Sequence, residues 1–166
     1  MKTLRYYALI IFLSSIPFIG IFSTNLLPHT HDGLIHLARI GAYFKALQDG
    51  QFPVRWAGDL NFGYGTPLFN FMYSVPYIIA SSFVYLGLGL VNAFKITLAL
   101  SFILSGIFML GFSLSFFKDI KKAFLVTVFY QFFPFRLVEI LTRGSFGEVY
   151  VYAFFPLVLW GIVLLF

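Results

Sequence analysis

The chain contains no cysteine, and only 10% of its 166 residues are charged. Without thiols it can form neither a disulfide framework nor a thiolate metal site, and the redox compartment stays undetermined. A soluble domain usually carries about a quarter charged residues. The scarcity of charge therefore argues against a water-soluble fold.

Short motifs that identify common enzyme classes are also missing. We find no Walker A loop, no G-x-S-x-G, no C-x-x-C and no dinucleotide-binding fingerprint. No repeat with a period of about 20–50 residues occurs. The glycine-rich segment Asn61–Pro67 is typical of turns, and we assign it no phosphate-binding role.

What the chain has in excess is apolar surface. Hydrophobic residues make up 60% of it, with 24 Phe and 10 Tyr, and the mean hydropathy is +0.92. These values indicate an integral membrane protein with the lipid bilayer as its main partner. The net charge of +5 includes a cluster at Lys118, Lys121 and Lys122 beside apolar runs. Such a cluster is typical of membrane topology, so we expect no nucleic-acid partner.

We expect an all-α membrane fold of four or five transmembrane helices, with residues 1–166 forming a single transmembrane region. The expected spans are about 6–22, 96–117, 123–140 and 149–166. Segment 68–90 is either a fifth span or an interfacial or re-entrant segment. The span 123–140 should bend near Pro134, because proline removes a helical hydrogen bond. We interpret segment 6–22 as an uncleaved span, since it is longer than the apolar part of a signal peptide.

Basic residues set the expected orientation in the cell membrane. Lys2 and Arg5 place the N-terminus in the cytoplasm, so the loop 24–67 should be extracytoplasmic. If segment 68–90 does not span, the lysines at 118–122 fall on the cytoplasmic side, as the positive-inside rule favours. The length of the segment alone favours a span, so both arrangements stay open.

The polar stretch 29–67 holds all three histidines of the chain and three of its six acidic residues. Thr30, His31 or Asp32 can cap an amphipathic juxtamembrane helix that runs to about Gln48. The glycines and prolines of 51–67 then predict an ordered loop. In that loop, Arg55, Trp56 and Tyr64 suit a membrane–water boundary.

Asp32 is the strongest candidate for chemistry. His36 follows four residues later, so both side chains share a helix face and could point at one ligand or metal. The alternative is that Asp32 only caps the helix. His29, His31 and His36 match no strong zinc signature, and a divalent cation such as Mg²⁺ or Mn²⁺ between Asp32 and a substrate phosphate is the better metal hypothesis.

Arginines supply the candidate phosphate ligands. Arg39, Arg55 and Arg143 could bind a phosphate bidentately, or they could lie among lipid headgroups or pair with Asp49, Asp59 or Glu148. Arg136 and Glu139 are three residues apart near a span end and are expected to neutralise each other.

The order of these features resembles a known membrane family. The residues that carry the resemblance are His31-Asp32-Gly33, Gly50-Gln51-Phe52-Pro53-Val54-Arg55-Trp56, Gly63-Tyr64-Gly65-Thr66-Pro67, and Arg143-Gly144 followed by Glu148 and Pro156. The pattern is similar to the N-terminal part of the multi-pass proteins called "6-pyruvoyl-tetrahydropterin synthase-related", which are similar to GT-C membrane glycosyltransferases. Despite the family name, we expect no pterin.

The resemblance implies transfer of a sugar from a polyprenyl-phosphate donor to an acceptor at the extracytoplasmic face. It gives Asp32 the role of general base or metal ligand, and Glu139 or Glu148 that of a second acidic residue. Arg55 and Arg143 become candidates for the lipid-linked phosphate. We therefore take Asp32 and Glu148 as candidate catalytic residues, with the candidate substrate-binding residues His31, His36, Arg39, Arg55, Trp56, Tyr64, Glu139 and Arg143.

Two other classes remain open: a transporter or lipid-handling protein, and a non-catalytic multi-pass protein. The usual marks of a transporter are inverted repeats and broken helices with charges at the membrane midplane, and we see neither in the sequence. The chain ends on an apolar run without a polar tail. We therefore expect it to be the N-terminal part of a longer protein, and to be inactive alone.

Overall fold

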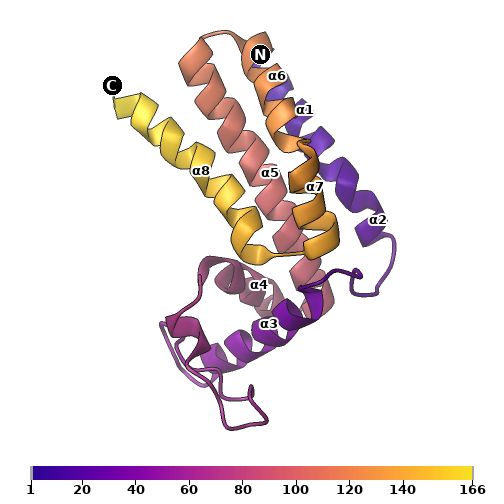
Figure 1. The fold of residues 1–166 in the computed structure, drawn as a ribbon, viewed down its shortest axis with the longest axis vertical. Coiled ribbons are helices and arrows are strands. Elements are labelled where there is room, and N and C mark those ends of the chain that lie inside the picture. The colour runs from indigo at the N-terminus through magenta and orange to yellow at the C-terminus, as the bar shows by residue number, and fades with distance from the viewer. Residues whose placement is uncertain (1, 166) are drawn as a thin grey trace. The chain divides into compact units, whose positions relative to one another are not determined.

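The computed structural model describes residues 2–165, which fold into helices joined by loops (Figure 1). The chain divides into two compact units. We call them the helical unit, residues 1–24 with 98–166, and the loop unit, Asn25–Thr97.

The helical unit contains the helices that are long and apolar enough to cross a membrane. Helix α1 is Lys2–Ser15, and a 3-10 turn, Ile16–Phe18, connects it to α2, Ile19–Phe22. The remaining elements are α5 (Leu90–Phe117, which enters the unit at Leu98), α6 (Ile120–Gln131), α7 (Pro134–Val138), the π-helical segment η3 (Glu139–Arg143) and α8 (Phe146–Leu165).

The three single candidate spans are Thr3–Phe22, Leu90–Phe117 and Phe146–Leu165. A fourth consists of Ile120–Gln131 and Pro134–Arg143, which meet at 49°. The all-helical membrane class is therefore confirmed. The expected count of four is reached if the bent pair is one span, and residues 2–165 contain no fifth candidate.

The break between α6 and α7 follows from the local sequence. Helix α6 starts where the Asp119 carboxylate accepts hydrogen bonds from the backbone N–H groups of Lys121 (2.8 Å) and Lys122 (3.3 Å). It ends at Gln131, and Pro134 opens α7 at a position where its missing N–H costs nothing. The prediction of a bend near Pro134 is confirmed.

Close packing of small residues holds α1, α5 and α6 together. A Cβ added to Gly106 of α5 would lie 2.7 Å from both Ile10 of α1 and Gln131 of α6. The buried Gln131 amide donates to Ser14 Oγ (2.8 Å) and to the Phe102 carbonyl (2.7 Å). Small residues allow helices to approach closely in a membrane, and buried polar groups then bond across the interface.

Helices α5 and α8 also pack closely at a glycine and are joined by hydrogen bonds between polar groups. The Trp160 ring lies against Gly111, where an added Cβ would be 2.6 Å from the ring. Its Nε1 donates to Ser115 Oγ at 2.9 Å, and Ser105 Oγ donates to the Tyr152 carbonyl at 2.9 Å. These contacts fix α8 along α5.

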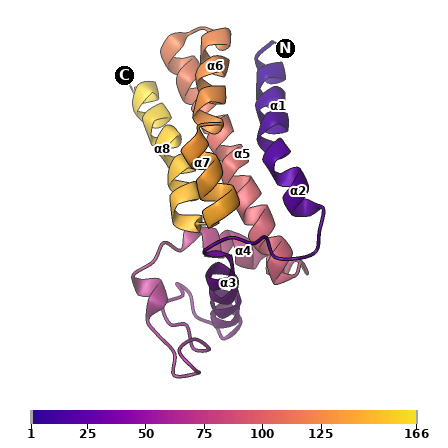
Figure 2. The ribbon, with the colours of Figure 1, turned by 45° about the vertical axis from the view of Figure 1, so that its right-hand side comes forward.

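Basic residues gather at one end of the helical unit. Arg5 and Lys121 line a common cavity of about 570 Å³. The start of α1, the turn between α5 and α6, and the end of α8 all lie at this end (Figures 1 and 2). The chain therefore runs back and forth through the unit, and Arg5 shares an end with the lysines at 118, 121 and 122.

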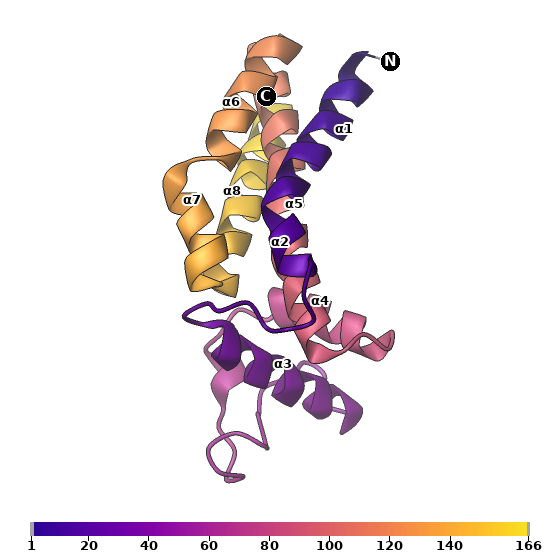
Figure 3. The same cartoon turned by 90° about the vertical axis from the view of Figure 1, so that its right-hand side faces the viewer.

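In the loop unit, α3 (Gly33–Gln48) packs against α4 (Val75–Tyr85) (Figure 3). Aromatic rings fill the contact: Tyr43 lies edge-on to Phe69 (4.8 Å between centroids) and stacks on Tyr77 (6.0 Å). The bounds of α3 confirm the predicted helix to about Gln48, and of the three candidate caps Thr30, His31 and Asp32 it is Asp32 that occupies the N-cap position. Helix α4 has 11 residues, about 16 Å of helix against about 30 Å of hydrocarbon, and is not among the candidate spans.

The segment 51–67 is a loop, as predicted, and three features order it. Gln51 accepts from the backbone N–H of Trp56 (3.2 Å) and donates to its carbonyl (3.3 Å). Ala57 and Thr66 form a two-residue antiparallel bridge. The Trp56 ring covers Gly65, where a Cβ would lie 2.4 Å from Nε1 and φ is +77°. Glycine is therefore required at position 65.

Candidate functional site

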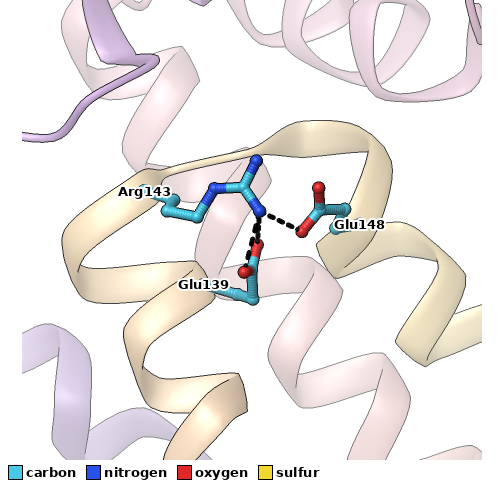
Figure 4. A network of polar contacts seen from close by, with 3 residues as sticks. All are labelled: Glu139, Arg143 and Glu148. Carbon is cyan, nitrogen blue, oxygen red and sulfur yellow. Dashed lines mark hydrogen bonds and ion pairs between the residues drawn. The ribbon is translucent and has the colours of Figure 1, made fainter.

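The helical unit contains a cluster of three charged residues (Figure 4). Arg143 Nη1 contacts Glu139 through both carboxylate oxygens, at 2.9 and 3.2 Å, and Glu148 Oε2 at 2.8 Å. The Glu139 side chain is 1% exposed, whereas those of Arg143 and Glu148 are 39% and 43% exposed. We call these residues the Glu–Arg–Glu cluster.

Local backbone geometry brings the cluster together. Glu139 and Arg143 lie at the two ends of the π-helical segment η3. Gly144 then adopts a left-handed conformation (φ 67°), which ends the helix and turns the chain into α8, where Glu148 lies in the first turn. Single π-helical turns often occur at functional sites.

One arginine serves two carboxylates, so the cluster carries a formal net charge of −1. The buried Glu139 anchors Arg143, and Arg143 in turn orients Glu148, whose exposed carboxylate can still accept a proton or a hydrogen bond. The cluster therefore presents a fixed, partly accessible carboxylate at the start of α8.

The expected pairing of Arg136 with Glu139 is wrong. Glu139 pairs with Arg143 instead, and the Arg136 guanidinium lies over the rings of Phe102, Tyr130 and Tyr152. The helix is irregular after Val138, so spacing along an ideal α-helix did not identify the true partner.

Asp32 occupies the N-cap position of α3, but its carboxylate makes no capping hydrogen bond. Only its backbone carbonyl takes part, accepting from the His36 N–H at 2.9 Å. The half-buried carboxylate of Asp32 therefore does not cap the helix. This leaves its carboxylate open to a role outside the helix.

His36 lies inside the loop unit rather than on its surface. It is 2% exposed, and its Nδ1 is 2.9 Å from the Tyr77 hydroxyl. Burial lowers the pKa of His36 to about 4; the charge of Arg39 adds to the shift, and that of Asp32 opposes it. At neutral pH, His36 is an uncharged hydrogen-bonding partner of Tyr77.

The other candidates of the loop unit lie at or near its surface. His31, Arg55, Trp56 and Tyr64 are exposed, and Arg39 is half-buried on α3. His31 immediately precedes Asp32, whereas Arg55, Trp56 and Tyr64 belong to the loop 51–67. The structure thus places the candidates in two groups within this unit.

Within residues 2–165, no group of three His, Asp or Glu side chains is close enough to hold a metal ion. The histidines at positions 29, 31 and 36 therefore form no joint site with Asp32. Any cation at Asp32 would need most of its ligands from a substrate or from water.

Sequence reasoning missed the surroundings of Arg136 and the partner of His36. Arg136 was detectable as a lone cation close to Pro134 in an otherwise apolar run, which indicates a functional position in a membrane segment. No local signal links His36 to Tyr77, because 41 residues separate them.

Comparisons of the chain with protein-family models, with curated proteins and with solved structures found no match.

Proposed function

We propose that this protein is a GT-C-like membrane glycosyltransferase that moves a sugar from a polyprenyl-phosphate donor to an acceptor at the extracytoplasmic face. The observation that carries the proposal is the Glu–Arg–Glu cluster, in which a buried carboxylate and an arginine orient the partly exposed Glu148. Charged groups next to membrane helices are costly unless they are paired or used. Here all three are paired, and Arg143 and Glu148 both remain partly exposed.

Asp32 is the proposed general base. Its carboxylate takes the proton of the acceptor hydroxyl while the new bond forms between that oxygen and the anomeric carbon of the sugar. The bond from this carbon to the phosphate oxygen breaks, and its electron pair leaves with polyprenyl phosphate. The missing capping bond supports this role, because a base must be able to reach its proton.

Arg55, exposed in the loop 51–67, is proposed to bind the donor phosphate. A guanidinium can stabilise the charge that develops on the departing phosphate. Arg143 is less suited to this role than its sequence position indicated, because two carboxylates already occupy its Nη1. We therefore assign Arg143 the positioning of Glu148.

The proposed orientation places the N-terminus in the cytoplasm and the loop 24–67 outside. The shared basic end of the helical unit supports it, since Arg5 and Lys121 line one cavity. Helix α4 is short for a span, which supports the arrangement in which 68–90 does not cross the membrane.

The test uses Asp32→Asn and Glu148→Gln in the full-length chain. Membranes containing each variant receive polyprenyl phosphate carrying radiolabelled glucose or mannose, and transfer of the labelled sugar out of the lipid donor is measured. We expect Asp32→Asn to lose about 100-fold or more in rate, because a general base typically contributes about 10²–10⁴-fold. We expect Glu148→Gln to lose rate as well, because it removes the charge of the carboxylate that Arg143 orients. The matched control is Asp49→Asn, a surface carboxylate that pairs with Lys45.

Equal amounts of all variants in the membrane would show that the loss of rate lies in the reaction and not in expression or membrane insertion. Activity of Asp32→Asn equal to that of the parent would remove Asp32 from the mechanism. Absence of sugar transfer by the parent chain with either donor, together with binding of the donor, would favour a lipid-handling protein.

A further inference from the structure

Arg136 is the most deeply buried cation of the helical unit, with 1% of its surface exposed. Its Cζ lies 4.9 Å from the centre of the Phe102 ring and 4.7 Å from those of Tyr130 and Tyr152. Nη1 donates to the Gln131 side chain and to the Tyr130 carbonyl. Rings and neutral oxygens therefore surround the guanidinium.

Two nitrogens of the Arg136 guanidinium make no hydrogen bond. Nε and Nη2 are buried and have no hydrogen-bond acceptor. Among residues 2–165, Arg136 also has no carboxylate within 4 Å. An unpaired cation and unsatisfied N–H groups in a membrane span are both unfavourable. This combination indicates an anion that completes the site.

A cavity of about 440 Å³ adjoins the guanidinium. Arg136 is the only ionisable residue of its lining besides two tyrosines, and the other walls are apolar: Met109, Val126, Phe129 and Phe133. Phe129 and Phe133 are 70% and 61% exposed, so the cavity opens among side chains that can face lipid. An amphiphile with an anionic head fits these walls better than a free ion.

We propose that Arg136 binds the phosphate of a membrane lipid, whose chain lies along the apolar walls of this cavity. Nε and Nη2 are parallel donors, and this fork matches two phosphate oxygens. Both atoms are sealed from solvent, so the phosphate must displace an aromatic side chain to reach them. The site is distinct from Asp32 and the Glu–Arg–Glu cluster, and it does not depend on sugar transfer.

The depth of Arg136 is compatible with a lipid headgroup. The helical segment Pro134–Arg143, which consists of α7 and η3, ends about 10 Å further along the axis. Half the hydrocarbon core is about 15 Å. A lipid phosphate would therefore reach the guanidinium by lying about 10 Å below the end of this helix, where a buried arginine draws headgroups and water inward by local thinning of the bilayer.

The test measures lipid binding to the delipidated full-length protein in detergent, by native mass spectrometry and by the shift in melting temperature. The probes are phosphatidylglycerol, a phosphate diester, and polyprenyl phosphate, a monoester. Diacylglycerol and polyprenol have matching chains without phosphate, and inorganic phosphate has no chain. We expect both lipid phosphates to bind and to stabilise the protein, and the three other probes to do neither.

Three variants locate the site. Arg136→Lys keeps the charge but loses the fork, and should weaken lipid-phosphate binding about tenfold or more. Val126→Phe narrows the cavity and leaves the Arg136 side chain in place, and should have the same effect. Lys122→Gln, at the exposed start of α6, removes one charge elsewhere and should bind like the parent.

Preference for polyprenyl phosphate would identify a monoester ligand, and preference for phosphatidylglycerol a diester ligand; each supports the proposal. Equal binding of diacylglycerol or polyprenol would overturn it, as would equally tight binding of inorganic phosphate. If Arg136→Lys does not fold, unchanged lipid-phosphate binding by Val126→Phe would be enough to overturn the proposal.

Discussion

At the scale of single residues, burial decides the chemistry of His36. The ring is enclosed by α3 and α4 and is held at Tyr77. Its charged form would lose solvation there without gaining a buried carboxylate, so the neutral ring is favoured. A group that stays neutral in the folded state but is protonated in the unfolded state makes stability depend on pH.

We predict that the loop unit loses stability in acid because of His36. Its pKa is about 4 when folded and about 6.5 when unfolded, so the unfolded state binds more protons between these values. The stability is fully present above pH 6.5, falls as the pH drops, and is lost by pH 4; the total is about 3 kcal/mol. NMR of ¹⁵N-labelled histidine should show this ring titrating near pH 4.

Tyr77→Phe is the control for that titration. Burial is the main cause of the shift, so His36 should keep a pKa well below 6.5 after its hydrogen-bond partner is removed. A ring that titrates near 6.5 in the parent protein would contradict the burial of His36.

The sequence identified several residues of the sites but not their partners. Asp32 was predictable as a helix start because a small acidic residue before an apolar periodic segment is a common N-cap. The assignment of Arg136 to Glu139 failed because it relied on ideal α-helical spacing, and Glu139 begins a π-helical turn. The left-handed turn at Gly144 brings Glu148 into the cluster. Residue spacing alone does not reveal this turn.

At the scale of helices, close contact between α5 and α8 depends on Gly111. We predict that Gly111→Val destabilises the helical unit by about 1–3 kcal/mol, because the new side chain must displace the Trp160 ring. The measurement is the melting temperature of the purified protein in detergent.

Gly161→Val is the matched control for that substitution. Gly161 lies next to Trp160 on α8, and an added Cβ there meets nothing within 4 Å. The Gly161→Val variant should have a melting temperature within about a degree or two of the parent's. Equal melting temperatures for the two variants would contradict the close packing of α5 on α8.

Helix positions were largely predictable, and helix ends were not. Apolar runs marked α1, α5, α6 and α8, and Pro134 marked the bend. Helix α5 begins at Leu90 rather than near residue 96, because Asn92 and Lys95 lower the hydropathy without breaking a helix. In the apolar run 68–90, a 3-10 turn at Leu68–Asn70 precedes the short α4, and Gly87 adopts φ +91° just beyond the end of α4.

At the scale of the whole molecule, the two units supply different parts of the proposed function. The helical unit supplies the candidate membrane spans, the Glu–Arg–Glu cluster and the proposed lipid site at Arg136. The loop unit supplies Asp32 at the start of a helix and an ordered loop that carries Arg55. Sugar transfer outside the cell requires the loop unit to face away from the cytoplasm.

That orientation is the central claim, and cysteine labelling tests it most directly because the chain has no cysteine of its own. Asp32→Cys and Lys121→Cys are expressed separately in the full-length protein and treated with a membrane-impermeant maleimide. We predict that Cys at position 32 reacts in intact cells, whereas Cys at position 121 reacts only after the membrane is permeabilised. Labelling of position 32 only after permeabilisation would place the loop in the cytoplasm and contradict the account.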